Sequence, residues 1–116
     1  MRRTCMALDL VDDDKLIASY EQLHKPGSIW PEIPTGIRQA GILDMQIYRI
    51  GRRLFMIVEH NEDTDLKTAF EKMANMPRQE EWAILMDHFQ QKLPEAGPHD
   101  HWAAMKPVFL LKEHLK

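Results

Sequence analysis

Hydrophobic and polar positions follow two different periods along this chain, and the changes of period divide it into short elements. Residues 2–10 carry apolar side chains on both sides of a period of two, which predicts a strand with two apolar faces. The three aspartates at 12–14 precede apolar residues spaced by three and four, and this pattern predicts a helix that ends at 26–27. A second helix is predicted to begin around Pro31 and to end at Gly41.

The middle of the chain predicts a β-hairpin. Residues 42–50 and 53–60 both alternate with a period of two, and Gly51 between them suits a tight turn. Apolar side chains stand on both faces of both predicted strands, so we expect both faces of the sheet to be covered.

Two helices and a last strand complete the predicted elements. Apolar spacing predicts a short helix that contains Leu66, Phe70 and Met73. Pro77 is predicted to start a further helix, and its apolar stripe consists of Trp82, Leu85, Met86 and Phe89. The apolar run from Pro107 to Leu111 predicts the last strand.

The order strand, helix, strand, strand, helix, strand predicts a ferredoxin-like α+β sandwich, formed by residues 1–116 as one domain. In this fold the helices cover one face of an antiparallel sheet. A chain of 116 residues is too short to cover the second apolar face itself. We therefore expect a homodimer in which two sheets pack against each other.

Composition and charge restrict the classes of partner. The chain is 44% hydrophobic and 28% charged, with a net charge of −3, and its basic residues occur only as short pairs such as Arg2-Arg3. A nucleic-acid partner is not expected, because phosphate binding needs a concentrated basic face. Cys5 is the single cysteine, so an intrachain disulfide and a cysteine-based zinc site are excluded. Its apolar surroundings indicate a structural thiol.

Neither a membrane span nor a signal peptide is predicted. No apolar run approaches the length needed to cross a bilayer. The short apolar stretch at the N-terminus is interrupted by Asp9 and followed by the aspartates at 12–14, which a signal peptide would not show. A reduced, cytoplasmic location is the expectation that follows.

The candidate chemistry is concentrated between Tyr20 and Glu32. Tyr20 and His24 are four residues apart on a predicted helix and therefore project from the same face. A histidine can give or take a proton near neutral pH. An indole such as Trp30 suits the apolar face of a sugar ring, and the carboxylate of Glu32 can hold hydroxyl groups. Spacing alone equally allows a half-buried histidine, a packed tryptophan and an acidic helix start.

Other polar and aromatic residues carry weaker signals. Trp82 fits a core position, whereas Trp102 could cover a pocket or simply pack. The adjacent side chains of His99-Asp100-His101 are expected to face different ways in a loop, and no distant third ligand is apparent. The cluster is therefore interpreted as a solvated loop rather than as a metal site. Asp44 and Glu59 lie within predicted strands, where a carboxylate on a covered face needs a partner or a polar site. The sequence contains no phosphate-binding glycine pattern and no nucleophile elbow.

The run Tyr20-x-x-x-His24-x-Pro26-Gly27-x-Ile29-Trp30-Pro31-Glu32 closely resembles the site motif of the L-rhamnose mutarotase family. The resemblance covers nearly the whole chain in order. It continues through Gly41-Ile42-x-Asp44-Met45-x-Ile47-Tyr48, Leu54-Phe55-Met56, Glu80-Glu81-Trp82 with Met86, and Trp102 with Met105 and Phe109.

The resemblance implies a reaction and roles for the residues. That family interconverts the α and β anomers of L-rhamnose or related 6-deoxy sugars on a dimeric ferredoxin-like fold, and it uses no cofactor. By resemblance, His24 would be the catalytic proton donor. The residues that would bind the monosaccharide are Tyr20, Trp30, Glu32, Asp44, Met45, Trp82 and Trp102. No metal is implied.

Two departures from the family pattern bear on the choice of sugar. Met45 stands where enzymes for rhamnose tend to carry a tyrosine, and Ala83 follows Trp82 where they carry a second tryptophan. The pattern from Gly41 to Tyr48 is similar to the L-fucose mutarotase-like branch. We therefore expect L-fucose to be favoured over L-rhamnose. The alternative to a mutarotase function is a cofactor-free small monooxygenase or a ligand-binding module on the same dimeric fold.

Overall fold

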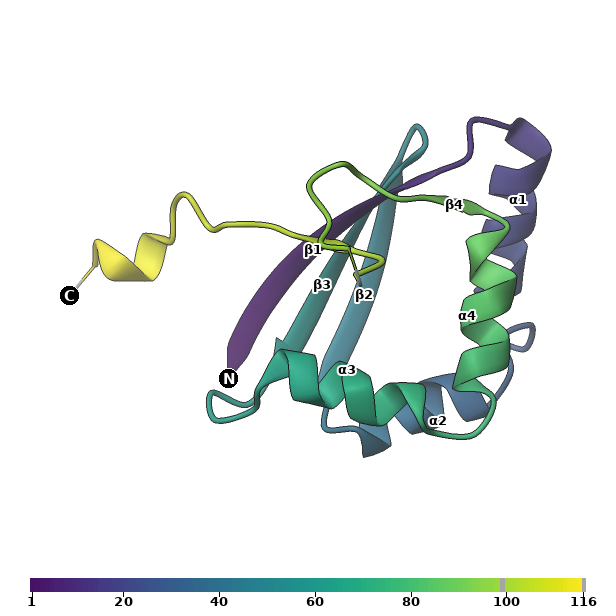
Figure 1. Ribbon diagram of the computed structural model, residues 1–116. Helices are drawn as coiled ribbons and strands as arrows, with labels where there is room; N and C mark the ends of the chain where they lie inside the picture. The colour runs from purple at the N-terminus through teal and green to yellow at the C-terminus, as the bar shows by residue number, and fades with distance from the viewer. Residues whose placement is uncertain (99, 116) are drawn as a thin grey trace.

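The sheet is assembled around the N-terminal strand β1 (Arg2–Leu10). The computed structural model describes residues 1–98 and 100–115. β1 pairs antiparallel with β3 (Arg53–His60) along its whole length, and β3 pairs on its other side with β2 (Asp44–Ile50). Gly51 joins β2 to β3 with a φ of 57°, a conformation that glycine adopts without steric cost. The predicted first strand and hairpin are confirmed (Figure 1).

The outer edge of β1 carries two short strands in place of the predicted last strand. β4 (Gln90–Gln91) pairs with Asp9 and Leu10, and β5 (Ala103–Ala104) pairs with Met6 and Ala7. The sheet order is β2-β3-β1-β4, with β5 also on β1. A period of two cannot be read from two residues, so neither strand has a signature in the sequence.

The strand predicted from Pro107 to Leu111 is wrong. The amide of Met105 donates to the carbonyl oxygen of Cys5 at 2.9 Å, and the chain then leaves β1. Residues 106–110 have no regular structure, and Leu111–Glu113 form the 3₁₀ turn η1. The segment is apolar without being part of a sheet, and Val108 is 97% exposed. Its apolar composition was therefore not a signal for pairing within this chain.

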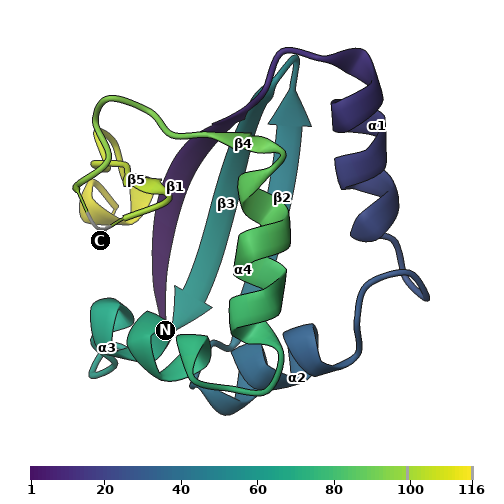
Figure 2. The same cartoon turned by 45° about the vertical axis from the view of Figure 1, so that its right-hand side comes forward.

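Four α-helices lie on one side of the sheet and at its end (Figures 1 and 2). Their bounds are Asp14–Leu23 for α1, Glu32–Gln39 for α2, Leu66–Ala74 for α3 and Gln79–Asp87 for α4. The aspartate predicted to start the first helix does so, because the Asp13 carboxylate accepts from the amides of Lys15 and Leu16. In the part of the chain that the structure describes, no helix is both long and apolar enough to span a bilayer.

The helices cover only one of the two apolar faces of the sheet. Alternation along β3 buries Leu54, Met56 and Val58 beneath the helices and leaves Phe55 and Ile57 half-buried on the opposite, open face. Two core clusters form under the helices. The first contains Leu10, Tyr20, Ile33, Leu54, Trp82, Met86 and Phe89, and the second contains Ile42, Met56, Val58 and Ala69.

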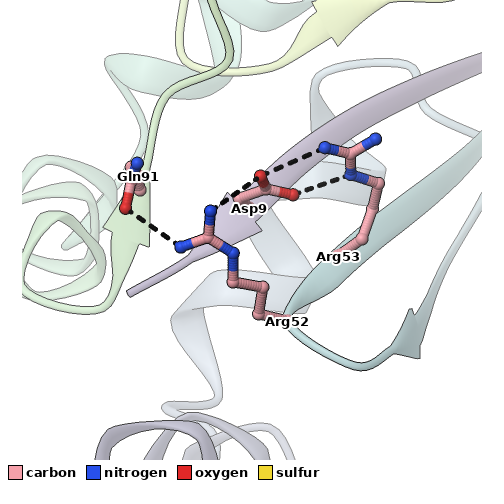
Figure 3. Close-up of polar contacts among 4 residues, drawn as sticks. All are labelled: Asp9, Arg52, Arg53 and Gln91. Carbon is pink, nitrogen blue, oxygen red and sulfur yellow. Dashed lines mark hydrogen bonds and ion pairs between the residues drawn. The ribbon is translucent and has the colours of Figure 1, made fainter. Parts of the chain in front are cut away.

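A buried carboxylate fixes the end of the β1–β3 pair. Asp9 is 5% exposed and accepts from Arg53 through Nε at 2.8 Å and Nη2 at 3.2 Å, as Figure 3 shows. Arg52 lies 3.9 Å from the same carboxylate and donates to Gln91 in β4 at 3.4 Å. The hydrogen bonds from Arg53 hold the pKa of Asp9 below its usual value, although burial acts in the opposite direction.

Replacing Asp9 with asparagine is expected to lower the free energy of unfolding at neutral pH by about 1–3 kcal/mol, since it removes charge-assisted hydrogen bonds from a buried site. The folded-state pKa of Asp9 is lowered, so this stabilisation is complete above the unfolded pKa of about 3.9 and is lost as the pH falls through the folded value. Urea unfolding over a pH series measures the difference. Asp63→Asn, in an exposed loop, is the control. If Asp9→Asn lowers the free energy of unfolding by the same amount in acid as at neutral pH, the ion pair of Asp9 is not the source of the stabilisation.

Candidate functional site

Four side chains from separate parts of the sequence form a continuous set of ring contacts, which we call the ring cluster: Tyr20, His24, Trp82 and Trp30. The rings of Tyr20 and His24 are 4.2 Å apart, those of His24 and Trp82 are 5.3 Å apart, and those of Trp82 and Trp30 are 5.2 Å apart. The last two pairs meet edge to face, a favourable geometry for aromatic rings. The structure therefore brings together the catalytic residue and three of the binding residues that the sequence predicted.

Local backbone structure explains how these residues meet. Tyr20 lies in α1 and His24 is the C-terminal cap of the same helix, so their side chains are one turn apart. Gly27, with a φ of 86°, then reverses the chain and returns Trp30 to the ring cluster. Trp82 comes from the buried side of α4.

The ring of His24 is held in one tautomer. Its Nδ1 lies 2.6 Å from the main-chain oxygen of Tyr20. Because a carbonyl oxygen can only accept, Nδ1 carries the hydrogen and the neutral ring keeps its lone pair on Nε2. Burial lowers the pKa of His24 below its ordinary 6.5, while the hydrogen bond to Tyr20 acts in the opposite direction. Near neutral pH the ring is mainly neutral, with Nε2 as the one position that gains or loses a proton.

Tyr20 does not titrate in the neutral range. It is 3% exposed, and burial raises the pKa of its hydroxyl to about 12, with the contact to Gln90 acting against the shift. The hydroxyl therefore remains protonated and serves as a hydrogen-bonding group rather than as an acid or base. The ring also meets Phe89 at 6.1 Å, so Tyr20 belongs to the core and to the ring cluster at once.

A cation completes one end of the ring cluster. The guanidinium carbon of Arg78 lies 3.9 Å from the centre of the Trp30 ring, and its Nη1 is 3.8 Å from the carboxylate of Glu32. Arg78 therefore connects Trp30 to Glu32, the residue predicted as a sugar ligand. Sequence reasoning missed Arg78, because an arginine after Pro77 carries no signal of which ring it will meet.

The other three residues predicted to bind the sugar are not members of the ring cluster. Met45 is half-buried on the helix side of β2, where it packs on the second core cluster. Trp102 is half-buried and packs against both core clusters. Asp44 is on the open face, because it pairs with Glu59 and accepts from Gln46 at 3.0 Å. The structure does not bring Asp44 to the ring cluster.

The strand carboxylates and the histidine-rich loop have ordinary partners. Glu59 accepts from Arg3 at 2.7 Å on the open face. His99 lies outside the described residues, whereas Asp100 and His101 are exposed and His101 lies 3.4 Å from Asp87. Within the ranges 1–98 and 100–115, histidine, cysteine and carboxylate side chains form no group of three that could hold a metal ion.

Two surface hollows lie away from the ring cluster. One, of about 490 Å³, is beside Asp9 and Arg53, and the other, of about 450 Å³, lies between α1 and the hairpin. Neither is lined by a histidine or an aromatic ring. Because the ring cluster contains the histidine and the aromatic rings that these hollows lack, we place the candidate site at the ring cluster.

Comparison with known sequences gives extended matches. A model of the family described as L-rhamnose mutarotase matches residues 3–111. An L-fucose mutarotase of Xanthomonas campestris pv. campestris is 41% identical over 113 residues, which cover 97% of this chain and 90% of that protein.

Comparison with solved structures confirms the predicted fold. An L-rhamnose mutarotase from Formosa agariphila superposes with a TM-score of 0.66 at 20% identity, over 95% of this chain and 98% of the other. A dimeric ferredoxin-like protein from an uncultured marine organism gives a TM-score of 0.53 at 16% identity, over 93% and 96% of the two chains. At these identities the structures show a shared ferredoxin-like α+β fold.

The protonation state of His24 can be measured directly. Nitrogen-15 NMR of the imidazole should show the Nδ1–H tautomer at neutral pH and a titration midpoint below 6.5. The physical reason is that burial disfavours the charged ring more than the Tyr20 carbonyl favours it. The exposed His101 supplies the reference signal in the same spectra. A neutral ring protonated on Nε2, or a midpoint above 6.5, would contradict this description.

Proposed function

This chain belongs to the L-rhamnose mutarotase family and is therefore a sugar mutarotase, an isomerase, and on that premise we propose that its substrate is a 6-deoxy-L-sugar, with L-fucose favoured over L-rhamnose. The observation that carries the proposal is the position of His24, a histidine held in one tautomer between the rings of Tyr20 and Trp82, with Trp30 packed against Trp82. This combination offers proton transfer beside an apolar surface that suits a sugar ring.

The proposed reaction opens and recloses the sugar ring. The proton donor is the protonated form of His24, which is the minor form near neutral pH because the pKa of the ring is lowered. It gives its Nε2 proton to the ring oxygen as the bond between that oxygen and the anomeric carbon breaks. The anomeric hydroxyl loses its proton to a base, either Glu32 or water, and becomes the aldehyde oxygen. On reclosure, the sugar hydroxyl attacks the other face of the carbonyl and gives its proton to His24, while the protonated base returns its proton to the carbonyl oxygen. The anomeric hydroxyl is restored and the anomeric centre is inverted. A pKa close to the working pH favours such exchange, and general acid–base help contributes about 10²–10⁴-fold.

Sugar binding is assigned to the rest of the ring cluster and its surroundings. Half-buried Trp30 offers more ring surface to a ligand than Trp82, which is nearly buried. Tyr20 and Glu32 would orient hydroxyl groups. Trp102 and Met45 border the same side of the sheet. Asp44 remains a predicted ligand, and it would have to reach a sugar from the open face.

The choice of L-fucose rests on sequence rather than on geometry. The L-fucose mutarotase of Xanthomonas is 41% identical over 97% of this chain. Met45 and Ala83 both stand where the rhamnose pattern has large aromatic residues, and we propose that these two differences favour L-fucose. The preference is therefore tested by comparing both sugars with the same enzyme.

We also propose that two copies associate through the open face of the sheet. Tyr48 and Ile50 are exposed there, next to half-buried Phe55 and Ile57. The segment 106–115 projects on the same side of the sheet, away from α1 and α4 (Figures 1 and 2). Its exposed apolar side chains are Val108, Phe109, Leu110, Leu111 and Leu115. A second copy on the open face would cover both surfaces, as a two-fold interface does.

Replacing His24 with glutamine should reduce anomer exchange by about 10²–10⁴-fold, since glutamine keeps a polar group but cannot donate a proton. Saturation-transfer NMR on the anomeric protons of L-fucose and L-rhamnose measures the exchange rate for each sugar. His101→Gln is the matched control, because His101 is exposed and outside the ring cluster. Exchange by His24→Gln at the wild-type rate would exclude His24 as the proton donor. Faster exchange of L-rhamnose than of L-fucose would exclude the proposed preference.

The proposed dimer predicts that Ile50→Asp weakens self-association by about tenfold or more in Kd, because it places a charge within an apolar interface. Ile84→Asp is the matched control. Ile84 is 60% exposed on α4, compared with 71% for Ile50, but it lies on the helix side. Sedimentation equilibrium measures the dimer Kd of the wild type and of both variants. A monomeric wild-type chain, or equal effects of the two substitutions, would exclude the open face as the interface.

A further inference from the structure

Arg78 has an unusual backbone conformation at the edge of the proposed sugar site. Its φ of 63° and ψ of 5° place it in the left-handed region, and it is the one non-glycine residue with positive φ in the described ranges. An arginine in this conformation is strained relative to glycine. Such strain persists where the surrounding structure imposes it, and it is concentrated at functional sites.

The neighbouring Gln79 holds the backbone in place. Gln79 is 6% exposed, and its Nε2 donates to the main-chain oxygens of Ile33 at 3.0 Å and Glu32 at 3.3 Å. Gly36 makes this approach possible, because a Cβ at that position would lie 2.6 Å from the same nitrogen. The first turn of α4 is thereby joined to the first turn of α2, which follows directly after Trp30 and Pro31.

The side chain of Arg78 then lies over Trp30. The distance of 3.9 Å from the guanidinium carbon to the ring centre is that of a cation–π contact. Two carboxylates hold the guanidinium: Glu32 at 3.8 Å and Glu81 at 3.5 Å. Both are on the helices that Gln79 joins. The strained backbone and the two carboxylates therefore act together to set one position for the cation.

A chain of contacts leads from this cation to the proton-transfer group. Arg78 contacts Trp30, Trp30 meets Trp82, and Trp82 meets His24. Trp30 is the more exposed of the two indoles, so its orientation depends more on Arg78 than on burial in the core. No polar contact joins Arg78 to His24 among the hydrogen bonds and ion pairs of the described residues.

We propose that Arg78 is a positioning residue of the sugar site: its guanidinium, set in place by Gln79, packs on one face of the Trp30 ring and holds the ring in the orientation in which its other face stacks against the sugar. This inference rests on the proposed function. Because Arg78 acts through Trp30, it affects sugar binding rather than the proton transfer at His24. An arginine is suited to this role, because its planar guanidinium lies flat on an indole and retains its charge at all working pH values.

The test uses Arg78→Gly and Arg78→Lys in the full chain. Glycine removes the guanidinium and also relieves the left-handed strain, so the variant should fold and be as stable as the wild type or more so. We expect KM for L-fucose to rise about five- to tenfold, the fold-change typical of a cation–π contact, with kcat unchanged within about twofold. Lysine should restore part of the affinity. Near-UV circular dichroism should show a changed tryptophan signal in Arg78→Gly.

Arg38→Ala, which removes an exposed cation from α2, is the matched control and should leave both kinetic constants unchanged. An unaltered KM in Arg78→Gly, or a loss confined to kcat, would overturn the positioning role while leaving the mutarotase proposal intact. If the wild-type chain accelerates the exchange of neither sugar, the sugar assignment is overturned, and the role of Arg78 in sugar stacking is overturned with it.

Discussion

The antiparallel register of β1 with β3 is the constraint on which the other features depend. Because side chains alternate across a strand, a slip of one residue would exchange the buried and open faces of the sheet. The observed register places Leu54, Met56 and Val58 under the helices and pairs Asp9 with Arg53 at the end of the strand. The buried ion pair and the buried apolar residues thus select the same register.

The core and the candidate site share their residues. Tyr20 and Trp82 are core residues, and they are also the two rings that contact His24. The carbonyl of Tyr20 holds the imidazole in one tautomer, and burial lowers its pKa. Packing in the core therefore determines the tautomer of His24 and lowers its pKa. A substitution at Tyr20 or Trp82 would therefore change stability and the protonation of His24 together.

The fold by itself does not decide the chemistry. Ferredoxin-like sheets with one open face serve many unrelated functions, and the reaction depends on the side chains placed on them. Here the distinguishing feature is a histidine whose Nδ1 is held by a main-chain carbonyl and whose ring contacts Tyr20 and Trp82. The open face and the projecting segment 106–115, which we propose as the interface between two copies, lie on the other side of the sheet from the helices.

Local patterns in the sequence were sufficient for the first strand, the hairpin and the four helices, since period, helix caps and turn residues act over a few neighbouring positions. The same patterns left Tyr20, His24 and Trp30 open between packing and a site, and they placed Trp82 in the core. The resemblance to the mutarotase family made all four residues site candidates. The local patterns also produced one wrong element, the strand at Pro107–Leu111, because an apolar run does not reveal what it packs against. Tertiary structure alone decided the two short strands on β1, the separation of Asp44 from the ring cluster, and the contact of Arg78 with Trp30. Each of these depends on segments far apart in the sequence, and their pairing is set by the packing of the whole sheet rather than by any local preference.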